Sequence, residues 1–118
     1  MTAPIAIDLP LPTSANRMWG KGRGRVFLSR PYKAWINQAN QAFMAAGLNR
    51  GRAAIAGRFT AKVYVRDGIR LDPDNIVKPL LDWAQRAGII AKDKHLRSLT
   101  LAYGDIGNDC RLVIEELA

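Results

Sequence analysis

The sequence predicts an α+β domain in which a small mixed sheet of about four or five strands accompanies two helices. Four segments alternate apolar with polar residues at the period of a strand. Two other segments repeat apolar residues at the spacing of one helix face. A chain of 118 residues fits one compact domain with a real core, so we treat residues 1–118 as a single domain.

The first half of the chain is expected to hold one strand, one basic loop and one helix. Residues 5–9 alternate apolar and polar side chains before two prolines, which indicates a short strand at or near a sheet edge. Residues 13–25 interleave basic residues with glycines, which predicts a mobile loop that contacts phosphates. From Tyr32, apolar residues mark one face of a helix that enters near 29–31 and ends at Gly47.

The second half is expected to hold three strands and one helix. Residues 58–66 alternate as a half-buried strand with a polar, basic face. Apolar residues at i, i+4 spacing over 76–84 predict an amphipathic helix that Gly88 closes. Residues 98–103 and 111–114 alternate on either side of a turn rich in Gly, Asn and Asp, so the chain is expected to end in a hairpin.

The composition favours a polyanionic partner. Eighteen Lys and Arg against ten Asp and Glu give a net charge of +8, which attracts nucleic acid through counterion release. The N-terminus lacks the pattern of a secretory signal, and no long apolar run is present, so we expect an intracellular protein without a membrane partner. Cys110 is the single cysteine, which excludes an intramolecular disulfide and indicates a small strand residue.

The segment Asp72, Pro73, Asp74 and Asn75 places two carboxylates two residues apart. On an extended segment both would point the same way and hold a divalent ion, and Pro73 keeps Asp72 out of the α region. The alternative is that Asp74 or Asn75 caps the helix that follows.

A third acid, Asp93, completes a candidate metal site with Asp72 and Asp74. Mg²⁺ prefers oxygen ligands, and a bound divalent ion activates water for phosphodiester hydrolysis. Lys78 falls in the first turn of the predicted helix, where it would reach back to a phosphate and stabilise negative charge. Alternatively, Lys78 pairs with Asp82 at i+4.

Nucleic-acid contacts are predicted at Asn16, Arg17, Lys21, Arg23, Arg25, Arg30 and Lys33. Among the aromatic residues around this basic segment, Trp19 is the candidate for stacking on bases, whereas Trp35 fits the core. His95 lies two residues from Asp93 and is a conceivable general base, but an exposed histidine in a loop that enters a strand is the commoner case.

Two stretches carry a family resemblance: LPLPTSANRMWGKGRGRVFLS, and RLDPDNIVKPLLDWAQRAGII followed by AKD. Together they resemble the RusA-type Holliday junction resolvases over nearly the whole chain. The resemblance implies a small α+β domain that forms a homodimer, with one acidic Mg²⁺ site per protomer. It makes Asp72, Asp74 and Asp93 catalytic metal ligands, makes Lys78 a catalytic lysine, and places Asn75 in the shell that supports them.

The chain departs from the family at one position. The family often has two adjacent acids at the third site, and here Lys92 takes the place of the first, leaving Asp93 alone. We therefore expect a higher Mg²⁺ requirement or a preference for Mn²⁺. The family is frequent in phage and prophage genomes, so the resemblance implies such an origin and the cytoplasm of a bacterial host.

The function that follows is Mg²⁺-dependent crossover junction endodeoxyribonuclease activity in DNA recombination and repair. A homodimer would nick four-way DNA junctions symmetrically, because paired strands of a junction are related by an approximate two-fold axis. Two alternatives stay open: a non-catalytic dimer that binds branched DNA, and a less selective nuclease that cuts flaps or forks. The sequence does not identify the dimer surface.

Overall fold

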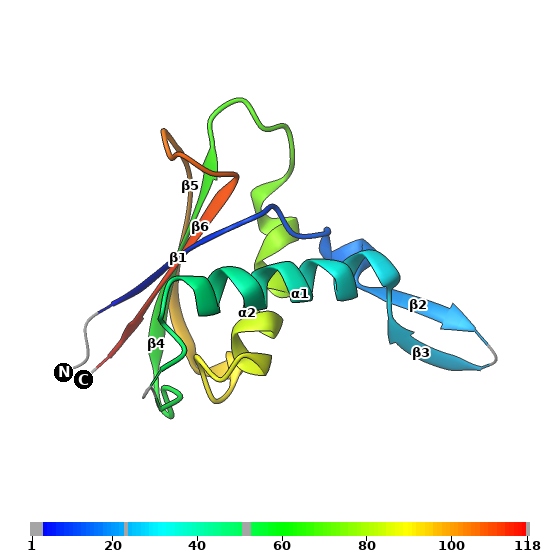
Figure 1. Cartoon of the computed structure of the whole chain (residues 1–118), viewed down its shortest axis with the longest axis horizontal. Helices are drawn as coiled ribbons and strands as arrows, with labels where there is room; N and C mark the ends of the chain where they lie inside the picture. Colours follow the sequence, from blue (N-terminus) through cyan, green and yellow to red (C-terminus); the bar gives the residue numbers. More distant parts are fainter. Residues whose placement is uncertain (1–3, 23, 51–52, 118) are drawn as a thin grey trace.

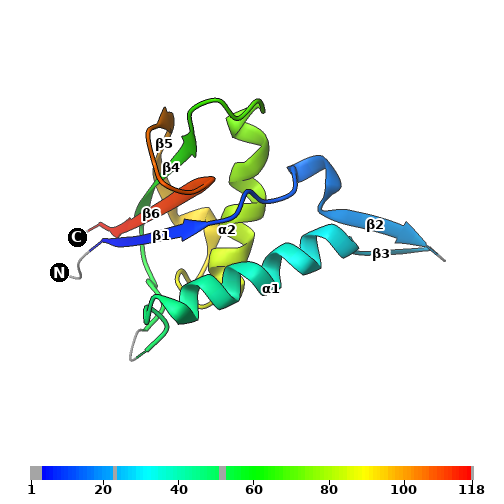
Figure 2. The ribbon, with the colours of Figure 1, turned by 45° about the horizontal axis from the view of Figure 1, so that its top comes forward.

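The computed structural model describes residues 4–22, 24–50 and 53–117. Within these ranges it contains two α-helices, a four-stranded mixed sheet and a separate two-stranded sheet. Both helices lie on the same side of the four-stranded sheet, and the two-stranded sheet projects away from it (Figures 1 and 2). The predicted α+β class with a small mixed sheet is confirmed.

The main sheet has the strand order β1-β6-β4-β5. Its strands are β1 (Ile5–Leu9), β4 (Phe59–Arg66), β5 (Leu96–Gly104) and β6 (Cys110–Glu116). β6 pairs antiparallel with β1 and β4, whereas β5 pairs parallel with β4. The edge position expected for β1 is confirmed.

The C-terminal hairpin expected from residues 98–114 is wrong, because β4 lies between β5 and β6. The physical reason is burial. Every second residue of β4, starting at Phe59, is at most 1% exposed, whereas most of β5 is exposed. β4, whose alternate side chains are buried in the core, therefore has a neighbour on each side, and β5 lies at the edge.

The helices α1 (Arg30–Ala45) and α2 (Val77–Arg86) follow the predicted pattern. The Ser29 side chain accepts a hydrogen bond from the Tyr32 N–H and so caps α1. Gly47 and Gly88 adopt φ angles of 72° and 80° just beyond the two helix ends, a conformation that glycine adopts without strain. No helix in the described part of the chain is long and apolar enough to span a membrane.

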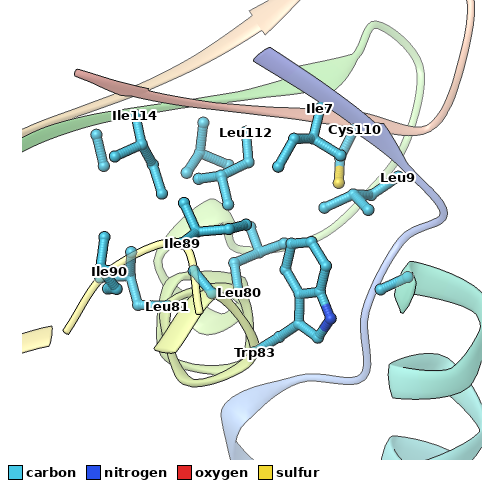
Figure 3. Packing of buried hydrophobic residues seen from close by; sticks show 14 of the residues in the cluster. Ile7, Leu9, Leu80, Leu81, Trp83, Ile89, Ile90, Cys110, Leu112 and Ile114 are labelled. Carbon is cyan, nitrogen blue, oxygen red and sulfur yellow. The ribbon is translucent and has the colours of Figure 1, made fainter. Parts of the chain in front are cut away.

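The core fixes α2 against the sheet and against α1. Leu80, Leu81 and Trp83 of α2 point towards the buried faces of β1 and β6 (Figure 3). Trp83 is fully buried, meets the rings of Trp35 and Phe43 edge to face at 5.9 Å, and donates through Nε1 to the Asn40 side chain. The predictions that Trp35 belongs to the core and that Cys110 is a small strand residue are confirmed.

The mobile loop expected for residues 13–25 is wrong. A short 3₁₀ helix, η1 (Ala15–Arg17), leads into a hairpin of β2 (Trp19–Gly22) and β3 (Arg25–Leu28). The glycines that favour a loop in sequence instead make room for the Phe27 ring, which packs against Gly20 and Gly22. Gly24, with φ of 71°, lies at the turn between the strands.

Candidate active site

The first acidic segment is a turn rather than a straight extended stretch. Asp72 has extended backbone angles, φ −84° and ψ 111°, and precedes a 3₁₀ helix, η2 (Pro73–Ile76). The extended conformation predicted for Asp72 is therefore confirmed. The prediction that Asp72 and Asp74 point the same way along a strand is wrong, because Asp74 lies inside η2, where each residue turns the chain by about 120°.

Neither acid acts as a helix cap. The Asp72 side chain makes no capping bond to η2, and the residue that caps α2 is Ile76. Among the described residues, the carboxylates of Asp72 and Asp74 have no hydrogen-bond or ion-pair partner, and both residues are exposed. The Asn75 N–H closes the turn by donating to the Asp72 carbonyl at 2.9 Å. The capping alternative is wrong, and both carboxylates are available to a ligand.

The structure joins Lys78 to Asp93, fifteen residues further along the chain. Lys78 Nζ lies 3.0 Å from Asp93 Oδ2, and the Asp93 N–H donates to Gln85 Oε1, also at 3.0 Å. Asp93 opens a third 3₁₀ helix, η3 (Asp93–His95). α2 therefore positions Asp93 through two contacts, one from Lys78 near the start of the helix and one from Gln85 near its end.

The i+4 pairing considered for Lys78 is wrong, because Asp82 has other partners. Arg86 Nε donates to Asp82 Oδ2 at 2.7 Å, and the Tyr32 hydroxyl donates to the same oxygen at 3.1 Å. Tyr32 is fully buried, and burial together with the Asp82 charge raises its hydroxyl pKa. The hydroxyl thus stays a donor at physiological pH.

The donor chemistry of the acids fits a divalent ion, but the structure does not gather all three. Carboxylate oxygens are the ligands that Mg²⁺ prefers, and Mg²⁺ usually keeps several waters beside one or two of them. The described residues contain no group of three or more His, Cys, Asp or Glu placed to hold a metal ion. Asp72 and Asp74 share one turn, whereas Asp93 is paired with Lys78.

A pocket of about 480 Å³ lies beside Asp72 and was not predicted from the sequence. Its lining includes Thr13 and Arg17 from the segment after β1, together with Asp72 and Asn75. Thr13 Oγ1 is buried and has no hydrogen-bond partner among the described residues. The sequence signal was the pair of prolines after β1, which marks the end of that strand and the start of the segment that lines the pocket. The pocket brings a predicted DNA-binding arginine to the acidic turn.

The predicted nucleic-acid contacts lie on η1, on the hairpin and on the first turn of α1. All those described are exposed: Asn16, Arg17, Lys21, Arg25, Arg30 and Lys33. Arg23 lies outside the described residues. Trp19 is 48% exposed, as a base-stacking role requires. His95 is half-buried rather than exposed, and its Nδ1 has no partner in the described part of the chain.

Comparison with known proteins supports a single assignment. The family model described as Endodeoxyribonuclease RusA matches residues 9–115, which is nearly the whole chain. A search of curated proteins with this sequence found no match. The matched range contains the acidic turn, Lys78, Asp93 and the hairpin.

Proposed function

Because the chain belongs to the RusA family of endodeoxyribonucleases, we propose that it is a Holliday junction resolvase. In this proposal it nicks two strands of a four-way DNA junction symmetrically, by Mg²⁺-dependent phosphodiester hydrolysis, in DNA recombination and repair. The observation that carries the proposal is the pair of carboxylates on Asp72 and Asp74, which are exposed and have no partner among the described residues of a protein of net charge +8.

Unpaired acids at a DNA-binding surface work against binding unless a cation lies between them and the phosphates. Two like charges about 4 Å apart repel by about 4 kcal/mol at an effective dielectric constant of 20. The chain has 18 Lys and Arg, yet none of those described pairs with Asp72 or Asp74. A divalent ion held by these acids would offset this repulsion and would supply Lewis-acid chemistry for phosphodiester hydrolysis.

The proposed ligands of Mg²⁺, or of Mn²⁺ in its place, are Asp72, Asp74 and Asp93. When bound, the ion would supply an activated water and neutralise charge on the phosphoryl oxygens. The Asn75 N–H orients the turn that presents Asp72. Lys78 holds the Asp93 carboxylate, and its ammonium group stabilises the negative charge that develops on the phosphate.

The DNA would lie along the basic surface formed by η1, the hairpin and the start of α1. Contacts from these Arg and Lys side chains to phosphates fix the position of the DNA without reading its sequence. Arg17 connects this surface to the acidic turn, because it lines the pocket that also contains Asp72. Binding should therefore weaken steeply as salt rises.

For the homodimer, we assign the second copy to the free edge of β5. Within the described part of the chain this nine-residue strand is paired on one side only, and it exposes Leu99, Leu101 and Tyr103, which are 38%, 36% and 45% exposed. A long apolar edge of this kind is normally covered in a stable protein. The Tyr103 hydroxyl donates to the Leu71 carbonyl at 2.9 Å, so this edge also contacts the residue before Asp72.

Sedimentation of Leu101→Glu tests the dimer surface. A charge at the centre of the assigned edge should convert the dimer to a monomer, because it would be desolvated against a second copy. Met44→Glu is the matched control, since Met44 is 60% exposed and belongs to α1 rather than to β5. A Leu101→Glu protein that remains dimeric would overturn the assignment of the edge.

Cleavage of a synthetic mobile four-way junction tests the function, with matched duplex and fork as competitors. Wild type should nick the junction in symmetric pairs with Mg²⁺ or Mn²⁺ and fail to cut in EDTA. Asp74→Asn should bind the junction at least as tightly and lose cleavage. Asp105→Asn, at an exposed acid between β5 and β6, should cut like wild type. Tight binding without any cutting would instead support a non-catalytic binder, and equal cutting of forks a less selective nuclease.

A further inference from the structure

The exposed Phe27 ring has a seat made by two glycines. Gly20 lies opposite Phe27 in the hairpin register. A Cβ added at Gly20 would fall 2.6 Å from Phe27 Cε2, and one at Gly22 would fall 3.3 Å from Cε1. The ring therefore spans both glycines with atoms from its two sides, in the space that side chains would otherwise fill. Phe27 as a whole is still 46% exposed.

The base of the hairpin is fixed to the body of the protein. Met18, just before β2, is fully buried, and Leu28, at the end of β3, packs against the core. The Ser29 N–H donates to the Met18 carbonyl at 2.8 Å, and Ser29 Oγ donates to the Arg17 carbonyl at 2.6 Å. The hairpin projects from this base, beyond the start of α1 (Figures 1 and 2).

The same base adjoins the acidic turn. η1, which leads into the hairpin, contacts η2, and Arg17 shares a pocket with Asp72. A DNA strand held at Asp72 and Asp74 therefore lies next to the point from which the hairpin rises. The hairpin is positioned to meet nucleotides that flank the bond to be cut.

The chemistry around the ring selects a nucleobase over a protein partner. Arg25 lies opposite Gly22 and so shares the face of Phe27, while Lys21 lies on the other face with Trp19. Both cations are exposed. An exposed aromatic ring that shares its face with Arg25, with Lys21 on the other face of the same hairpin, suits a base that stacks while flanking phosphates are neutralised. A paired base inside a duplex does not offer its face, so the base must be unpaired.

We propose that Phe27 is a stacking platform for an unpaired nucleobase at the branch point of the DNA, with Lys21 and Arg25 on the adjacent phosphates. This inference rests on the proposed function, because it takes branched DNA as the substrate. The glycine seat holds the ring before DNA arrives, so little conformational entropy is lost on stacking.

The test compares two single-stranded DNAs of equal length, one with bases and one abasic, in the Asp74→Asn background to prevent cutting. The background protein should prefer the strand with bases, and Phe27→Leu should reduce that preference by about tenfold, the size of one base–aromatic stack. Leucine still covers the glycines but has no ring. Phe27→Trp should retain the preference, as should Val26→Ala, which alters the opposite face of the hairpin.

The salt dependence of binding separates stacking from phosphate contact. Phe27→Leu should leave the slope of log affinity against log salt concentration unchanged. Lys21→Ala should make that slope less steep and weaken binding to both DNAs equally. A Phe27→Leu protein that keeps the preference for bases, or loses affinity for both DNAs alike, would overturn the inference.

A four-way junction with 2-aminopurine at the branch point locates the stacked base. The fluorescence of 2-aminopurine should change when the Asp74→Asn protein binds and should not change when the same protein also carries Phe27→Leu. Equal changes with both proteins would overturn the placement of the stacked base at the branch point. Failure of the proposed function is distinguishable from failure of this inference. In that case the wild type would not cut the junction, whereas the Asp74→Asn protein would still prefer the single strand with bases. Cleavage with no base preference would remove the stacking role alone.

Discussion

Replacing Lys78 by methionine separates a catalytic role from a structural one. Methionine keeps an unbranched stem and removes the charge that lies 3.0 Å from Asp93. The two side chains are 56% and 35% exposed, so water already screens the pair. Exposed ion pairs contribute about 0.2–1 kcal/mol, so the free energy of unfolding should fall by less than about 1 kcal/mol.

The rate of junction cleavage should respond far more strongly. Loss of one group that stabilises transition-state charge typically lowers the rate by about 10²–10³-fold, or about 2.7–4 kcal/mol. The same substitution removes at most one phosphate contact, so affinity for the junction should fall by a much smaller factor. A variant that folds and binds but cuts slowly is the expected result.

Urea unfolding followed by tryptophan fluorescence measures the stability, and single-turnover cleavage at saturating protein measures the rate. Arg66→Met is the matched control, because it removes an ion pair of the same length, 3.0 Å to Asp109, between side chains that are 50% and 41% exposed. Its stability loss should be similar and its cleavage rate unchanged. Equal rate losses in the two variants, or an unchanged rate in Lys78→Met, would refute the reasoning.

Three further predictions follow from the contacts described. Asp72→Asn should change the free energy of unfolding by no more than about 0.5 kcal/mol, because the carboxylate has no partner among the described residues, yet weaken Mg²⁺ binding in calorimetry without DNA. Tyr32→Phe should cost about 1–2 kcal/mol in urea unfolding, since the hydroxyl donates to the Pro79 carbonyl and to Asp82. Burial first, and then Asp109 and Asp8, raise the pKa of the Cys110 thiol to about 12. The pKa of a thiol in an unfolded chain is about 8.5. The contribution of Cys110 to the free energy of unfolding is therefore complete below that pH, and it falls by at most about 1.4 kcal/mol per pH unit as the pH rises towards the folded pKa. Unfolding measured across pH 8–11 should lack this component in Cys110→Ala.

Periodicity located the strands and helices of the main body but not the order of the sheet. An alternation of two identifies which side chains share a face, and it contains no information about which strand lies alongside. β5 and β6 are consecutive and joined by turn residues, so local signals favoured a hairpin. In the structure, β4 lies between β5 and β6 with its alternate side chains buried. This strand order depends on the packing of the whole sheet, which local signals do not contain.

The hairpin was missed for a related reason. Glycine signals a loop when each residue is weighed alone, and residues 20, 22 and 24 are all glycine. In the structure two of them form a strand because Phe27, on the partner strand, fills the space above them. A cross-strand contact of this kind cannot be predicted until the strand pairing is known. Glycines that favour a loop in isolation then provide the space in which an aromatic ring packs.

Residue spacing in the sequence proposed the acids, Lys78 and their chemistry, but the partner of Lys78 depended on the core. Asp82 is the nearest acid on the same helix face, and an isolated helix would pair it with Lys78. In the folded protein, Arg86 and the buried hydroxyl of Tyr32 both bind Asp82 Oδ2. Lys78 instead pairs with Asp93, the acid that the family resemblance assigns to the metal. The bonds that Asp82 makes to Arg86 within α2 and to Tyr32 of α1 therefore determine which carboxylate faces the lysine. This links the packing of the two helices to the chemistry of the site.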